Sequence, residues 1–296
     1  MYAPTSATPN VTFTWTRASV VGISPAGPTA GNNNVNEALT NSLTNPLTVR
    51  YVYTLRNNAT NCTNTQNVDV IVNARPVINS TLTPAAICSG TTFSYVPTSN
   101  QDSEVDFTWT RAAVAGISNV AVTTPRTGSP EEILVNTSLS AVTVSYVYTL
   151  TNRTTNCTST ATVTVSVKPV PFLTSKPSLS VCSVVSGSGN NVNYALNPSI
   201  AGATITWTRA QTSPSLTPLF GAGDATTSQL ITESLTNNNA NPVVAVYQVT
   251  LSSNSCSATE NVNITVYPKP TLTSNIQRDP ICSGSVFIIQ PLYPLL

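Results

Sequence analysis

The sequence Phe-Thr-Trp-Thr-Arg at residues 13–17 returns at residues 107–111, and it returns again as Ile-Thr-Trp-Thr-Arg at residues 205–209. Apolar and polar side chains alternate within the motif, which is the period-two pattern of a strand with one buried face. The Trp residues of the three copies are spaced 94 and 98 residues apart. Because self-similarity at a fixed long period indicates tandem structural units, the motif predicts three related domains.

Further strands follow each copy of the motif. Residues 49–55 read Val-Arg-Tyr-Val-Tyr-Thr-Leu, residues 144–150 read Val-Ser-Tyr-Val-Tyr-Thr-Leu, and residues 246–251 give a looser version. A polar turn with one Cys comes next, and an alternating strand such as residues 162–167 closes the unit. Pro-containing joints then end the strand, because Pro fixes φ and removes a hydrogen-bond donor.

These joints divide the chain into four parts. We name them repeat 1 (residues 1–75), repeat 2 (76–169), repeat 3 (170–268) and the C-terminal segment (269–296). Repeats 2 and 3 are expected to be complete domains. Repeat 1 is expected to lack its first strand, because its opening residues align with the interior of repeat 2 and not with its start.

Composition narrows the possible functions. Only 8% of the residues are charged, the net charge is +1 and no basic cluster occurs, so nucleic acid is not expected as a partner. No stretch reaches the ~18 to 20 apolar residues that span a bilayer, so membrane insertion is not expected either. His is absent, which removes the commonest general base and a common metal ligand. Since no Ser has an activating base and no acidic calcium loop occurs, we expect no catalytic residues, no metal site, no cofactor and no enzyme activity.

Units of about 95 to 100 residues with short alternating strands predict an all-β chain of tandem antiparallel β-sandwich domains in a linear array. The Trp-Thr-Arg strand, the Tyr-x-Tyr strand, the late Cys and the Cys-Ser-Gly sequence at residues 88–90 and 282–284 resemble immunoglobulin-like, PKD-like repeats of large surface and gliding-associated proteins of Bacteroidota-type bacteria. Residues 182–184 depart from this pattern because they lack the Gly. The resemblance implies an extracellular location at a bacterial cell surface.

Aromatic residues at strand spacing are expected to anchor the cores, and these are Trp15, Trp109, Trp207, Tyr53 and Tyr148. Each Trp is followed two residues later by an Arg, at positions 17, 111 and 209. These Arg residues either form a row that binds a ligand or pair locally with Glu37, Glu132 and Glu233. The second interpretation is favoured because an Arg can pack its stem on the Trp.

The six Cys residues favour disulfides over a metal site, because neither a Cys-x-x-Cys pair nor a His accompanies them. Within a unit, the early and the late Cys are expected to pair, giving the intrachain disulfides Cys88–Cys157 and Cys182–Cys256. Each would stabilise its domain by roughly 2 to 4 kcal/mol and requires an oxidising compartment.

Two cysteines remain, Cys62 and Cys282. Residues 281–287 of the C-terminal segment match residues 87–93, the opening segment that repeat 1 lacks. Three sandwiches in line span on the order of 100 Å, so the segment is expected to reach a neighbouring copy of the chain. It would insert there as a donor strand through Ile281, Ser283, Val286, Phe287 and Ile289, and an intersubunit disulfide Cys62–Cys282 would fix it.

This hypothesis makes the chain its own partner in a head-to-tail homopolymer, an extracellular filament or surface stalk. The alternative is that the chain is a piece of a long multi-repeat surface adhesin, in which neighbouring repeats supply the missing strand. In that case loops such as residues 24–36 and 211–228 would bind glycans or proteins on host or other cell surfaces.

Overall fold

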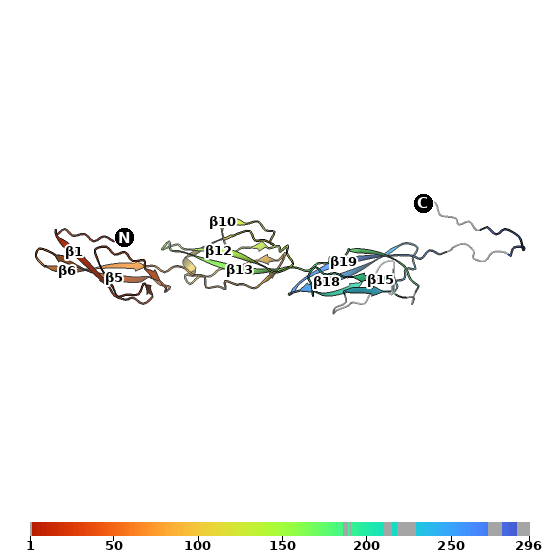
Figure 1. Ribbon diagram of the computed structural model, residues 1–296, viewed down its shortest axis with the longest axis horizontal. Helices are drawn as coiled ribbons and strands as arrows, with labels where there is room; N and C mark the ends of the chain where they lie inside the picture. The colour runs from red at the N-terminus through yellow and green to blue at the C-terminus, as the bar shows by residue number, and fades with distance from the viewer. Residues whose placement is uncertain are drawn as a thin grey trace. The chain divides into compact units, whose positions relative to one another are not determined.

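The computed structural model describes residues 2–185, 189, 191–209, 215–217, 229–271 and 280–288. These residues form strands, loops and one short 3-10 helix, so the all-β prediction is confirmed (Figure 1). Contacts within the chain divide it into two units. The first comprises Met1–Val170 together with Asn254–Cys256, and the second comprises Pro171–Ser253 and Ser257–Leu296.

Repeat 1 has a four-stranded sheet in the order β3-β1-β5-β6 and a two-stranded sheet of β2 and β4. The long strand β5 pairs antiparallel with both β1 and β6, and Trp15 lies opposite Tyr53. The strands are β1 (Val11–Arg17), β2 (Ile23–Ser24), β3 (Thr29–Asn32), β4 (Thr40–Asn41), β5 (Leu47–Asn57) and β6 (Thr63–Val72).

Repeat 2 has a five-stranded sheet in the order β10-β9-β12-β13-β7 and a two-stranded sheet of β8 and β11. Figure 1 shows the long strands β12 and β13, which pair antiparallel over their length. The elements are β7 (Ile87–Cys88), β8 (Thr92–Phe93), the 3-10 helix η1 (Asp102–Glu104), β9 (Val105–Arg111), β10 (Val122–Thr127), β11 (Glu132–Ile133), β12 (Val142–Asn152) and β13 (Thr158–Lys168).

Repeat 3 has a sheet in the order β14-β19-β18-β16 and a two-stranded sheet of β15 and β17. A two-residue turn joins β18 to β19, and both of its residues, Asn254 and Ser255, have positive φ, as a type I′ hairpin requires. The strands are β14 (Ser178–Cys182), β15 (Val192–Ala195), β16 (Thr204–Arg209), β17 (Leu230–Glu233), β18 (Val243–Ser253) and β19 (Cys256–Tyr267).

Each repeat has its own hydrophobic core between its two sheets. In repeat 2 the alternate residues Val163, Val165 and Val167 of β13 are fully buried, because the two-stranded sheet and its Phe93 cover them. Period-two alternation explains this arrangement, since every second side chain of a strand points to the same face. The tandem β-sandwich prediction is thereby confirmed.

The repeats differ at one edge of the main sheet. In repeat 2 the outer strand β7 pairs parallel with the end of β13, and in repeat 3 β14 pairs parallel with β19. Among the described residues of repeat 1, no strand covers the corresponding edge of β6. This edge therefore presents unpaired backbone groups.

Candidate functional site

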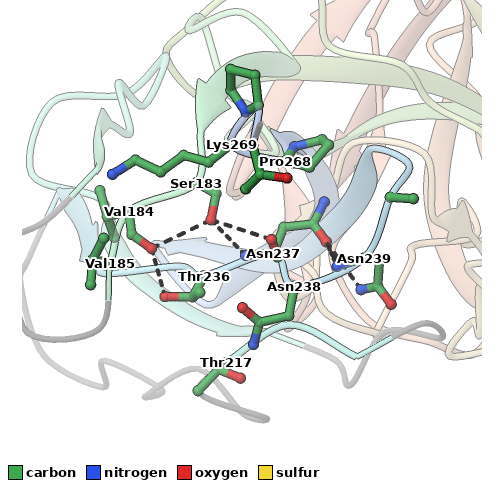
Figure 2. A pocket seen from close by; sticks show the side chains of 13 residues that line it. Ser183, Val184, Val185, Thr217, Thr236, Asn237, Asn238, Asn239, Pro268 and Lys269 are labelled. Atoms are coloured by element: carbon green, nitrogen blue, oxygen red, sulfur yellow. Dashed lines mark hydrogen bonds between the residues drawn. The ribbon is translucent and has the colours of Figure 1, made fainter. Parts of the chain in front are cut away.

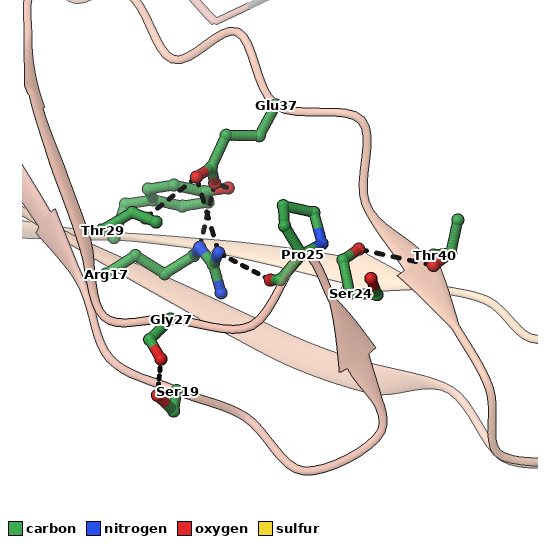
Figure 3. A network of polar contacts seen from close by, with 9 residues as sticks. Arg17, Ser19, Ser24, Pro25, Gly27, Thr29, Glu37 and Thr40 are labelled. Carbon is green, nitrogen blue, oxygen red and sulfur yellow. Dashed lines mark hydrogen bonds and ion pairs between the residues drawn. The ribbon is translucent and has the colours of Figure 1, made fainter.

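Beside each Trp lies an ion pair whose Arg side chain is fully buried. In repeat 1 the Arg17 guanidinium donates from Nε to Glu37 at 2.9 Å and from Nη2 to the carbonyl oxygen of Pro25 at 3.0 Å. Thr29 and Tyr51 donate hydroxyl hydrogen bonds to the same Glu37 carboxylate. Figure 3 shows the Glu37 carboxylate directed at the guanidinium.

The same cluster recurs in the other repeats. Arg111 donates to both oxygens of Glu132, at 2.8 and 2.9 Å, and Arg209 donates to Glu233 at 2.9 Å. The three Arg side chains have no exposed surface. The predicted local pairing is therefore confirmed, and the Arg residues do not form an exposed row for a ligand.

Protonation in these clusters follows from their contacts. Burial raises the pKa of Glu132, but hydrogen bonds from Arg111 and Tyr146 outweigh that effect and leave the pKa below its usual value. The pKa of Glu37 is lowered by the same balance. Burial and the hydrogen bond to Glu132 hold the pKa of Tyr146 well above its usual range. In repeats 1 and 2 the Glu of the cluster is therefore ionised and the Tyr beside it is neutral.

The expected core anchors lie in these cores. The structure buries Trp15, Trp109, Trp207, Tyr53 and Tyr148, each with at most 7% of its surface exposed. Each Trp ring meets a Tyr edge-on, with centroid distances of 5.4 to 5.5 Å, in the pairs Trp15–Tyr51, Trp109–Tyr146 and Trp207–Tyr247. Such edge contacts between aromatic rings add to the stabilisation from burial.

The predicted intrachain disulfides Cys88–Cys157 and Cys182–Cys256 are wrong. The structure instead joins Cys88 to Cys256, with 5.7 Å between their Cα atoms. Cys88 lies opposite Lys168, the last residue of β13, whereas Cys157 precedes its first residue. Eleven strand residues span about 35 Å, far more than the ~7 Å between Cα atoms that a disulfide tolerates.

Repeat 3 has the same geometry. Cys182 lies opposite Tyr267 at the end of β19, and Cys256 is the first residue of that strand. The early and the late Cys of one repeat therefore lie at opposite ends of its sheet, and a disulfide joins two successive repeats instead of clamping one. The remaining cysteines are free thiols, of which Cys62, Cys182 and Cys282 are exposed and Cys157 is half-buried.

A hydrophobic groove lies along the open edge of repeat 1. It encloses about 250 Å³ and is lined by Tyr2, Val35, Leu39, Tyr51, Tyr53 and Val70, among others. The counterparts of Val70 and Leu39 in repeat 2 are Val165 and Leu134, and both are fully buried, whereas Val70 is 38% exposed. The groove therefore lies where Phe93 packs against Tyr146 in repeat 2, with 5.1 Å between ring centroids.

The C-terminal segment contains the residues that were expected to fill such a groove. Ile281, Val286 and Phe287 are 54%, 82% and 51% exposed, and no strand forms within the described residues 280–288. Ser283 lies in a turn at residues 283–284, within the segment, and Ile289 lies outside the described residues.

The turn at residues 282–285 has the same geometry as the turn at residues 88–91 of repeat 2. The amide of Ser285 donates to the Cys282 carbonyl at 3.1 Å, as the amide of Thr91 does to Cys88 at 3.1 Å. Gly284 and Gly90 both have positive φ, +90° and +82°, which Gly adopts at little cost.

A second cavity opens in repeat 3 beside the Pro joint. It encloses about 920 Å³ and is lined by Ser183, Asn237, Pro268 and Lys269, among others (Figure 2). Asn237 connects its own loop to the end of β19, because its side-chain amide donates to the carbonyl oxygens of Asn241 and Val266 at 2.9 and 2.8 Å.

Asn41 and Asn136 make the equivalent hydrogen bonds in repeats 1 and 2. Sequence reasoning missed these three Asn residues. The sequence could have predicted them, because a Leu-x-Asn pattern recurs at the same place in each repeat.

Within the described ranges, no group of three or more His, Cys, Asp or Glu side chains gathers in one place. That part of the chain also contains no helix with the length and apolar character needed to cross a membrane. Most of loop 211–228 lies outside the described residues.

Comparisons with known proteins identify the repeat. Residues 85–171 and 181–270 match the family model described as a PKD-like domain. Comparison with curated proteins gave no match.

Several solved structures are similar to the chain. A three-domain I-band fragment of titin is 14% identical with a TM-score of 0.37, and the match covers 90% of each chain. Mouse protocadherin-24 EC1-3 is 11% identical with a TM-score of 0.31, and 90% of this chain and 92% of that chain are covered. An endo-fucoidan hydrolase of glycoside hydrolase family 107 is 14% identical with a TM-score of 0.26 over 86% of this chain, which spans 39% of the enzyme's length.

Proposed function

We propose that this chain, which belongs to the PKD-like domain family, is a structural subunit of an extracellular filament or surface stalk that assembles head to tail by β-strand donation. Tandem domains of this type are typical of extracellular structural and adhesion modules. The donor is the C-terminal segment of one copy, and the acceptor is repeat 1 of the next copy.

The open edge of β6 is the observation that carries the proposal. In repeats 2 and 3 a parallel strand covers the same edge, whereas in the described part of repeat 1 the edge is bare. Val70 on β6 is 38% exposed, whereas its counterpart Val165, on the covered sheet of repeat 2, is fully buried. An exposed apolar edge favours addition of a further strand.

The donor fits the acceptor by the register of repeat 2. Ile87 lies opposite Val167 in the parallel pair, so Ile281 would lie opposite Val72. Phe93 lies opposite Glu132, so Phe287 would lie opposite Glu37 and stack on Tyr51. In this placement Phe287 takes the position of Phe93, which is buried in repeat 2, and Ile281 takes that of the half-buried Ile87.

The proposed role is not catalytic. The sequence has no His, and the buried Glu residues are already engaged by Arg and Tyr. The proposed partner is a second copy of the chain, and contacts with glycans or other surface molecules are secondary to assembly. The proposed location is the bacterial cell surface.

Assembly under reducing conditions tests strand donation separately from disulfide formation. We expect the full chain to form end-to-end polymers in reductant, measured by sedimentation velocity, and a chain that lacks residues 279–296 to stay monomeric. A synthetic peptide of residues 279–296 should then bind the truncated chain and protect β6 amides from hydrogen exchange.

The matched control is the same peptide with Phe287→Glu, which should not bind because a carboxylate cannot occupy the apolar groove. Polymers formed by the truncated chain would rule out strand donation. One very large band from native material that survives reduction would instead identify the chain as a piece of a long multi-repeat adhesin.

A further inference from the structure

We infer that the free cysteines form disulfides between subunits in the register that joins Cys88 to Cys256, so that Cys182 bonds to Cys62 of the next subunit and Cys282 bonds to Cys157 of the next subunit. This inference rests on the proposed strand donation. In this register the early Cys of each repeat bonds to the late Cys of the repeat that follows. The donated Cys282 serves as the early Cys of repeat 1 in the next subunit. All six cysteines are then paired.

The early cysteines are structurally equivalent. Cys88 lies opposite Lys168 and Cys182 lies opposite Tyr267, each at the final residue of the closing strand. The next residue repeats the match, because the Ser89 amide donates to Lys168 and the Ser183 amide donates to Tyr267, both at 2.8 Å. Cys282 lies in a turn of the same geometry as the turn that contains Cys88. Inserted in repeat 1, Cys282 would lie beside Asn73, the counterpart of Lys168.

The late cysteines are equivalent as well. In repeats 1 and 2 the amide that ends the long strand donates to the carbonyl oxygen of the Cys at 3.0 Å, in the pairs Asn57–Cys62 and Asn152–Cys157. Asn61 and Asn156 precede these cysteines with positive φ of 59° and 55°. In repeat 3 the turn is shorter, but Cys256 still occupies the end of the hairpin, directly after positive-φ residues.

At the junction of repeats 1 and 2, the residue after β6 and the turn that leads to Cys157 line one cavity. The turn that leads to Cys256 lies at the end of β13, where Lys168 Nζ donates to the Asn254 carbonyl at 3.0 Å. At the end of repeat 1, Asn73 lines a cavity of about 270 Å³ together with Thr155 from the turn that leads to Cys157. A donated Cys282 beside Asn73 would therefore meet Cys157.

The pairing of Cys182 with Cys62 of the next subunit follows from the end of repeat 3 at which Cys182 lies. Cys182 is exposed, and its neighbour Ser183 lines the cavity of Figure 2. This cavity is bordered by Asn237, the counterpart of Asn41 at the end of repeat 1. Repeat 1 of the next subunit would take the position there that repeat 2 takes on repeat 1, and its late Cys is Cys62.

The predicted Cys62–Cys282 bond does not fit this register. A donated Cys282 lies at the end of β6, and Cys62 precedes the start of that strand. Ten strand residues separate the two positions by about 33 Å. The same distance argument excludes Cys88–Cys157 in repeat 2.

Each bond forms by thiol–disulfide exchange with an external disulfide oxidant, R–S–S–R. One cysteine thiolate, such as that of Cys62, attacks the oxidant to give a mixed disulfide and releases R–S⁻. The Cys182 thiolate then displaces the second R–S⁻, and the two protons lost by the cysteines yield two R–SH. The two cysteines are oxidised by two electrons, and the oxidant is reduced by two.

Double Ser variants test the pairing, because each leaves two of the four thiols and keeps Cys88 and Cys256. Polymers assembled in reductant are oxidised with glutathione disulfide, alkylated and run on a denaturing gel. The variant that keeps Cys62 and Cys182 and the variant that keeps Cys157 and Cys282 should give ladders in steps of about 31 kDa. The variant that keeps Cys62 and Cys282 is the matched control and should stay at one step.

The outcomes separate the two proposals. If the variants assemble in reductant but only the one with Cys62 and Cys282 forms a ladder, the register is wrong and strand donation stands. If they assemble and none forms a ladder, the register is also wrong. If the chain does not assemble in reductant, strand donation itself fails.

Discussion

Cys88 and Cys157 lie at opposite ends of β13, because Cys88 joins that strand in parallel at its last residue while Cys157 precedes its first. A disulfide that includes Cys88 must therefore reach outside repeat 2. The bond to Cys256 does so, and it fixes the hairpin turn Asn254–Cys256 within the first unit.

Alkylation of the full chain with Phe287→Glu, which should stay monomeric, tests this bond without prior reduction. We expect iodoacetamide to label Cys62, Cys157, Cys182 and Cys282, because they are free thiols. Cys88 and Cys256 should stay unlabelled and appear in one cross-linked peptide that separates on reduction. A peptide that links Cys88 to Cys157, or label at Cys88, would contradict the structure.

Replacement of a buried Arg tests the ion pair in the core. Arg111→Met leaves Glu132 with its charge partly buried and without its cation, so we expect the free energy of unfolding of repeat 2 to fall by about 3 to 5 kcal/mol. Urea denaturation followed by Trp fluorescence measures the change.

Arg50→Met is the matched control. Arg50 also forms a two-point ion pair, with Asp69, but both side chains are exposed to water, which screens the pair. Its unfolding midpoint should match that of the unchanged chain. Equal losses in the two variants would show that burial does not set the value of these pairs.

Stability should depend on pH at both extremes. The pKa of Glu37 and Glu132 is lowered in the folded state, so their contribution is present above the unfolded value of 4.5 and is lost as pH falls through the lower folded values. The pKa of Tyr146 and Tyr247 is raised, so stability is lost as pH rises above the unfolded value of 10.0.

We therefore expect a plateau of the urea midpoint between roughly pH 5 and pH 9, with a fall on each side. The variant Glu132→Gln should have a lower plateau and a shallower acid fall, since that carboxylate no longer takes up a proton on unfolding. A midpoint that rises below pH 4 would contradict the assignment.

Equivalent Val residues in two repeats should respond differently to a charge. Val70→Glu places a carboxylate in the open groove, where 38% of the Val surface is exposed, so repeat 1 should stay folded and lose at least tenfold of its affinity for the peptide of residues 279–296. Isothermal calorimetry on the truncated chain measures this loss.

Val165→Glu is the counterpart in repeat 2. That side chain is fully buried, so an unpaired carboxylate there should cost more than about 4 kcal/mol and unfold the domain. If Val70→Glu unfolds repeat 1 as readily, the groove is closed in solution, and strand addition to it is excluded.

The sequence alone determined the repeat and its strands. Alternation around Trp109 and along residues 162–167 specifies which side chains face the core, because a strand reverses side-chain direction at every residue. The partner of Arg111 was also predictable, since a buried guanidinium requires an acid at the same end of the sandwich and Glu132 recurs with the repeat.

Only the tertiary structure decided which cysteines meet. Sequence spacing places Cys88 and Cys157 in one repeat, but their distance depends on which strand β7 joins, in which direction and at which end. The same holds for the groove, since Val70 and Val165 occupy identical positions in their patterns and differ only in whether another strand covers them. Period-two alternation specifies a face of a strand, whereas contacts along its edge are made by residues far away in the chain or in another molecule.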